Sequence, residues 1–156
     1  MNVSSDSASY TIPLGIFRDE ENKTRAIRRA KQSVRWLVHR LKADHLLTLT
    51  YRENMTDIGQ LKRDFDAFRR LVTARYPDWK YVAAREKQDR GAWHLHLAVQ
   101  GRQDLNYLRT CWYKVLGCVG ATGAAVLGQV DIKASKSKDP SQWVVTSGFG
   151  APLEAQ

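Results

Sequence analysis

The fold is decided by residues 79–99, WKYVAAREKQDRGAWHLHLAV, in which two strand-like runs flank a short polar turn. Residues 79–86 carry aromatic, β-branched and small apolar side chains, and residues 92–99 continue in the same way. Residues 87–91 between them are polar and end in Gly91, which is typical of a hairpin loop. The segment therefore predicts two antiparallel strands joined by a tight turn.

His94 and His96 stand two residues apart on the second strand of this hairpin. Because strand side chains alternate between faces, both imidazoles point to the same side of the sheet. A turn centred near residue 90 places Glu86 across from His94 on that face. Two imidazoles and a carboxylate bind Mg²⁺, Mn²⁺ or Zn²⁺, so these three residues are the predicted ligands of a divalent metal. The alternative is that the two histidines only hydrogen-bond within the sheet.

The sequence on either side of the hairpin predicts three helices and two more strands. Apolar residues recur every three or four positions over residues 22–43, from the Thr56/Asp57 cap to Tyr76, and from about Asp104 to Leu116. Residues 46–51 and 129–133 have the composition and alternation of strands. The order is one helix followed by β-α-β-β-α-β.

This order predicts an α+β fold of the ferredoxin-like, split βαβ type, with an antiparallel sheet, helices on one face and an extra basic N-terminal helix. One sheet face would then be open to a ligand. The chain has 156 residues, which suits one domain. We expect an irregular leader over residues 1–21, the domain over residues 22–134, and a basic, irregular C-terminal segment over residues 135–156.

The charge of the chain favours a polyanionic partner. Lysine and arginine number 25 against 16 acidic residues, for a net charge of +9. A domain this basic is typical of nucleic-acid binding, although a charged surface for solubility is the alternative. Eight of the basic residues fall between Lys23 and Lys42 with no acid among them. The candidate nucleic-acid contacts are Arg28, Lys31 and Arg35 on the first helix, and Lys80, Arg85, Lys87, Arg90 and Trp93 around the hairpin.

The sequence gives no sign of a membrane or secretory protein. No run approaches the roughly 18 apolar residues of a membrane span. Residues 1–10 lack both the basic and the apolar parts of a signal peptide. We therefore predict a cytoplasmic protein without a membrane partner.

The run from Glu86 to Val99, with its His-Leu-His core, resembles motif II of the rolling-circle replication initiators of plasmids and phages, the Rep proteins of the HUH endonuclease superfamily. Residues 46–51, LLTLTY, resemble motif I of the same family, and residues 128–132 resemble its fourth strand. One helix and one strand separate the two motifs, as in the family. The resemblance covers roughly residues 24–135.

This resemblance implies a domain that binds single-stranded or hairpin DNA at an origin. The two motif II histidines and an acidic residue would hold a divalent metal that polarises the scissile phosphate. A tyrosine would attack the phosphorus and leave a 5′-phosphotyrosine and a free 3′-hydroxyl. The match carries over to His94, His96 and Glu86.

The sequence departs from the family at motif III, a tyrosine followed three residues later by lysine. No tyrosine follows Ile132, and the expected window holds Trp143 and, three residues later, Thr146. Either the nucleophile has been lost, or another tyrosine serves. Tyr107 and Tyr113 are the only tyrosines after the histidines, and they flank the apolar stripe of the third helix.

Two functions therefore compete. The first is a Rep-type domain that binds single-stranded or hairpin DNA beside a metal, and nicks and rejoins it if a nucleophile is present. The second is a catalytically inactive, Rep-derived nucleic-acid-binding regulator, such as a phage- or plasmid-encoded inhibitor of a host defence machine. The second function would add a host nucleic-acid-processing protein as a partner. A protein-interaction module ranks third.

Overall fold

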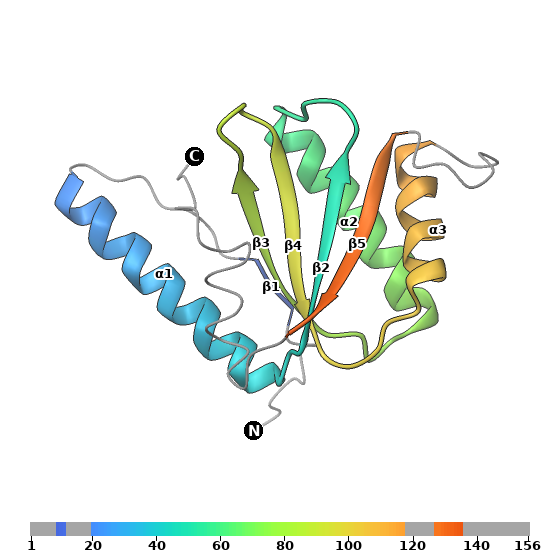
Figure 1. Cartoon of the computed structure of the whole chain (residues 1–156), viewed down its shortest axis with the longest axis horizontal. Coiled ribbons are helices and arrows are strands. Elements are labelled where there is room, and N and C mark those ends of the chain that lie inside the picture. The colour runs from blue at the N-terminus through green and yellow to red at the C-terminus, as the bar shows by residue number, and fades with distance from the viewer. Residues whose placement is uncertain (1–8, 12–19, 118–126, 136–156) are drawn as a thin grey trace, which may run out of the picture.

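The computed structural model of the chain describes residues 9–11, 20–117 and 127–135 (Figure 1). The elements, in chain order, are β1 (Ser9–Thr11), α1 (Glu20–Leu41), β2 (His45–Tyr51), α2 (Ile58–Arg75), β3 (Tyr81–Lys87), β4 (Trp93–Val99), α3 (Leu105–Leu116) and β5 (Gly128–Ala134). The predicted α+β fold is confirmed. The predictions for residues 1–8, 12–19 and 136–156 lie outside the described residues.

One five-stranded sheet forms the centre of the fold, in the order β1-β3-β4-β2-β5. Strands β3, β4, β2 and β5 are mutually antiparallel, as predicted. Strand β1 is a correction, because it lies inside the leader that was expected to be irregular. It pairs parallel with β3, Ser9 opposite Tyr81. Three residues are too few to show an alternation, and their strand geometry comes from the free edge of β3.

Helices α2 and α3 cover one face of the sheet and build the main core (Figure 1). Their apolar stripes meet the inward side chains of the strands in a cluster of large residues. Its largest fully buried members include Trp93, Trp112, Phe68, Leu47 and Leu97. The rings of Phe68 and Trp112 meet edge to face, with centroids 5.8 Å apart. This face therefore holds most of the buried apolar surface.

Helix α1 packs on the opposite face, so the face that was expected to be open is partly covered. Val34 and Val38 of α1 are buried in a second, smaller cluster. Their partners from the sheet and its entry are short side chains: Ala43, Leu46, Val82, Ala84 and Ala98. A helix can lie close to a sheet only where the sheet side chains are small, and these residues provide that surface. The remaining part of the face carries the histidines.

Local signals fix where the elements begin and end. Asp57 caps α2 by accepting hydrogen bonds from the amides of Gly59 and Gln60 at 2.8 and 3.1 Å. Asp104 caps α3 by accepting from the Tyr107 amide at 3.1 Å. Both caps were predicted. In the β3–β4 turn, the Gly91 amide donates to the Gln88 carbonyl, and Gly91 takes a φ of 84°, which favours glycine.

Candidate metal centre and nucleic-acid interface

Glu86, His94 and His96 come together near the hairpin end of the sheet. In the β3–β4 ladder Glu86 lies opposite His94, and Ala84 lies opposite His96. The predicted register is therefore confirmed. One ligand atom from each of the three side chains lies within 4.8 Å of the other two. The three residues, named here the triad, sit on the same sheet face as α1.

His96 is the most enclosed member of the triad and is held from both sides. Its Nε2 donates to the Glu86 carboxylate across 2.6 Å, and its Nδ1 lies 3.1 Å from the hydroxyl oxygen of Thr48. The side chain of His96 is only 8% exposed, so these bonds are shielded from water. A threonine hydroxyl both donates and accepts. Thr48 can therefore hold the ring in either neutral tautomer, including the one that frees Nε2 for a metal.

His94 has a different partner. Its Nδ1 lies 3.1 Å from the amide nitrogen of Gln88, and the Gln88 oxygen accepts from Nε of Arg90 at 3.0 Å. Burial lowers the pKa of His94, and the neighbouring His96 lowers it further, while Glu86 opposes this. The ring is therefore held in its neutral form, which is the form that binds metals.

The donor set fits a small divalent cation. Imidazole nitrogens and a carboxylate are ligands that Mn²⁺, Mg²⁺ and Zn²⁺ accept, with Zn²⁺ and Mn²⁺ preferring nitrogen more than Mg²⁺. Ligands bound at about 2.0–2.2 Å from one ion lie about 3–4 Å apart. The His96–Glu86 contact is shorter than this, and the triad as a whole is wider. Small side-chain rotations convert one arrangement into the other.

The basic candidates divide among three places. Arg85 and Lys87 alternate with Glu86 on β3, so they point to the opposite face, paired with Leu95 and Trp93. Arg90 is exposed at the hairpin tip, close to the triad through Gln88. Lys80 is exposed at the far end of β3. Arg28 and Arg35 are exposed on α1, whereas Lys31 is half-buried.

Trp93 requires a correction. Its side chain is 2% exposed and belongs to the main core, with the Lys87 ammonium 5.7 Å from its ring centroid. A ring buried in this way offers no face to a nucleic-acid base. The sequence placed Trp93 beside His94, but the alternation of the strand turns the two side chains to opposite faces.

Tyr107 and Tyr113 also lie on the far side of the sheet from the triad. The Tyr107 hydroxyl donates to the carbonyl of Leu71 at 2.9 Å, and Tyr113 packs against the main core. Every tyrosine whose side chain the structure describes belongs to or packs against that core: Tyr51, Tyr76, Tyr81, Tyr107 and Tyr113. The window around Trp143 lies outside the described residues.

Sequence reasoning missed Thr48 and Gln88, the two residues that orient the histidines. Thr48 is 48 positions from His96, and only the β2–β4 pairing brings them opposite each other. A signal was present in residues 46–51, where the threonines alternate with leucines and so mark the polar face of that strand. Gln88 is in the turn, where a polar residue needs no special explanation.

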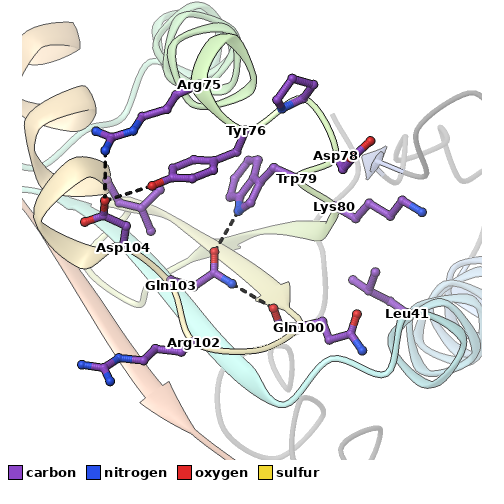
Figure 2. A pocket seen from close by; sticks show the side chains of 12 residues that line it. Leu41, Arg75, Tyr76, Asp78, Trp79, Lys80, Gln100, Arg102, Gln103 and Asp104 are labelled. Atoms are coloured by element: carbon purple, nitrogen blue, oxygen red, sulfur yellow. Dashed lines mark hydrogen bonds and ion pairs between the residues drawn. The ribbon is translucent and has the colours of Figure 1, made fainter.

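The largest hollow in the described residues is a pocket of about 640 Å³ at the other end of the sheet (Figure 2). Its polar groups bond to one another. The Trp79 indole donates to Gln103 at 2.9 Å, and the Tyr76 hydroxyl donates to Asp104 at 3.0 Å (Figure 2). Asp104 also caps α3, so its carboxylate occupies the helix N-terminus. The pocket is therefore a joint between loops, and the triad remains the candidate site.

Comparison with known proteins gives one match. A family model for the replication-associated protein ORF2 matches residues 44–146, more than half of the 156-residue chain. The matched stretch includes β2, the whole triad and β5. No curated protein and no solved structure matches the chain. None of the helices within residues 20–117 is both long and apolar enough to cross a membrane.

Proposed function

The chain belongs to the replication-associated protein ORF2 family, and from this premise we propose that it binds single-stranded or hairpin DNA beside a divalent metal held by Glu86, His94 and His96. The association with replication comes from the family. The finer assignment, an HUH-type Rep domain, is supported by the triad, because the residues that the sequence motif pairs are neighbours in the fold. That juxtaposition carries the proposal.

A metal held by the triad would polarise a phosphate oxygen of the bound strand. The protein residues around it have separate roles. Thr48 orients the His96 ring, and Gln88 orients the His94 ring. Arg90, exposed at the tip and bonded to Gln88, is placed to contact a phosphate that approaches the triad. Phosphate contacts of this kind position a strand without reading its sequence.

Metal binding is tested by thermal unfolding with and without Mn²⁺. A ligand that binds only the folded protein raises its melting temperature. We expect such a rise in the wild type and its loss in the double variant His94→Ala, His96→Ala. Arg102→Ala, an exposed cation at the opposite end of the sheet, serves as the matched control. A wild type without any rise would remove the metal from the proposal.

Cleavage is tested with labelled single strands and Mn²⁺, followed by denaturing electrophoresis. A covalent adduct that survives denaturation indicates a tyrosine nucleophile, and Glu86→Gln should then abolish it. Tyr107→Phe and Tyr113→Phe show whether either hydroxyl forms that bond; we expect neither to matter, because both residues lie in the other layer. The DNA affinity itself should fall steeply with salt.

A second candidate is a Rep-derived protein that binds nucleic acid without cutting it, such as a regulator or an inhibitor of a host nucleic-acid machine. The observation that favours it is the placement of the tyrosines, because none with a described side chain shares a face with the triad. It predicts metal and DNA binding with no adduct across diverse strands. An adduct on any strand would exclude it.

A further inference from the structure

Helix α1 has a solvent-facing side that the proposed metal site does not use. Val34 and Val38 point into the second cluster, and Trp36 lies between them in the sequence. Two residues along a helix correspond to a rotation of about 200°. Trp36 therefore points directly away from the sheet, and its side chain is 56% exposed. Among the large apolar residues that the structure describes, it is the most exposed.

The surroundings of Trp36 are basic. The Arg40 guanidinium lies 5.0 Å from the centre of the Trp36 ring, in a cation–π contact on one ring face. Arg29 precedes Trp36 by seven residues and Arg25 precedes it by eleven, so all four residues fall within about 60° of the helix circumference. We name Arg25, Arg29, Trp36 and Arg40 the outer stripe. Each of its members is exposed.

From this arrangement we propose that the outer stripe is a second binding site for single-stranded nucleic acid, separate from the triad, in which Trp36 stacks on an unpaired base. The inference rests on the proposed function for its ligand class. A positively charged groove or ridge that follows the backbone, combined with an aromatic ring, is the usual way in which proteins hold single strands. A duplex presents no base face along its length, so the exposed ring favours an unpaired strand.

The dimensions of the outer stripe agree with such a ligand. At a rise of about 1.5 Å per residue, the fifteen steps from Arg25 to Arg40 span about 22 Å. This is the length of about six nucleotides stacked at about 3.4 Å each. Glu21, which pairs with Arg25, is at the edge of the stripe, and no acid occurs between Lys23 and Lys42. An acidic surface of a protein would satisfy the arginines but would leave the indole without a partner.

The outer stripe faces away from the sheet, whereas the triad lies on the sheet itself. A strand bound at one site therefore does not block the other. Two linked contacts on one strand raise the overall affinity without any new interaction, because the second binding event becomes intramolecular. We infer that the outer stripe holds a part of the DNA that flanks the segment at the triad.

The test is a fluorescence titration with a mixed-sequence single strand of about 20 nucleotides. Trp79, Trp93 and Trp112 are buried, and subtracting the spectrum of a Trp36→Phe variant removes their emission together with that of Trp143. The difference spectrum then reports Trp36. We expect the single strand to quench it and the matched duplex to quench it much less. Unchanged emission at saturation, or equal quenching by the duplex, would overturn the proposal.

Affinity measurements separate stacking from charge. Trp36→Ala should weaken binding of the single strand by roughly 5- to 100-fold, the effect of losing one stacked base, while Trp36→Phe keeps most of the affinity. Because no charge is removed, the salt slope should stay unchanged in Trp36→Ala, whereas Arg29→Ala should lower it by about one. Wild-type affinity in Trp36→Ala would contradict the proposal. An unchanged melting temperature confirms that the variant is folded, since the side chain is exposed.

The double variant His94→Ala, His96→Ala distinguishes this inference from the proposed function. It should lose the Mn²⁺-dependent rise in melting temperature but keep the quenching of Trp36. If the wild type shows no metal effect and Trp36 is still quenched, the metal centre fails and the outer stripe stands. If the metal effect is present and Trp36 is silent, the reverse holds.

Discussion

On the face of the sheet that α2 and α3 cover, β4 presents Trp93, Leu95 and Leu97, whereas on the opposite face it presents His94 and His96, followed by Ala98. The first face is filled by large, fully buried side chains. The second combines small residues under α1 with polar residues near the hairpin. One strand thus serves two purposes, because its alternation separates the residues that stabilise the fold from the residues that bind.

The largest expected difference between the two faces is in stability. Trp112 is 0% exposed, and its indole donates to the Thr50 carbonyl at 3.1 Å. Trp112→Ala should lower the free energy of unfolding by about 3–5 kcal/mol. Val38→Ala on the other face removes less volume and should cost about 1–2 kcal/mol. Urea unfolding measures both, and equal costs would mean that the α1 face contributes as much to the core as the α2/α3 face.

Gly128 offers a second way to disturb the main core. A Cβ atom at this position would lie 2.3 Å from the Thr50 carbonyl oxygen and 2.6 Å from a methyl group of Leu116. Gly128→Ala should therefore push β5 away from β2 and α3, at a cost of about 1–3 kcal/mol. Urea unfolding again gives the value. Gly59→Ala is the control, because a Cβ there meets nothing closer than 3.2 Å. A larger loss in Gly59→Ala would contradict this packing.

Thr48 allows the binding face to be changed without removing a metal ligand. Thr48→Val keeps the shape of the side chain but removes the oxygen that lies 3.1 Å from Nδ1 of His96. Loss of such an orienting partner typically lowers metal affinity by about 10- to 100-fold. Titration with Mn²⁺, followed by the melting temperature, measures the change. Thr48→Ser retains the hydroxyl and should bind like the wild type; equal losses in both variants would assign the effect to packing.

The smallest expected effect is on the pH dependence of stability. Burial and His96 lower the pKa of His94 in the folded protein below its ordinary value of about 6.5. The unfolded chain therefore binds a proton more readily, and the contribution of neutral His94 is present above about pH 6.5. It is lost as the pH falls from there through the lowered folded pKa. Urea midpoints between about pH 5 and 8, measured without metal, should decrease on acidification, and less so in His94→Asn. An identical pH profile in that variant would assign the decrease to other groups.

Much of the binding face could be predicted from local sequence. The spacing of His94 and His96 fixes a common side for both, and the length of the turn fixes Glu86 opposite His94. These are properties of strand geometry, so no distant contact was needed. The caps Asp57 and Asp104 were predictable for the same reason. Their hydrogen bonds reach only two or three residues along the chain.

Other features depended on contacts between distant segments. The partner of His96 is Thr48, which the β2–β4 register brings into place. Strand β1 forms only because β3 has a free edge. The burial of Trp93 depends on α2 and α3 filling the other side of the sheet.

By itself, the sequence determined the order of the elements, the hairpin and the triad, because each follows from the periodicity of a helix or a strand and the length of a turn. Only the tertiary structure decided that α1 lies across the face of the triad, with Val34 and Val38 on Ala84 and Ala98 and with Trp36 toward solvent. The physical reason is that an amphipathic helix is compatible with either face of a sheet. The size of the side chains that the assembled strands present selects between the two.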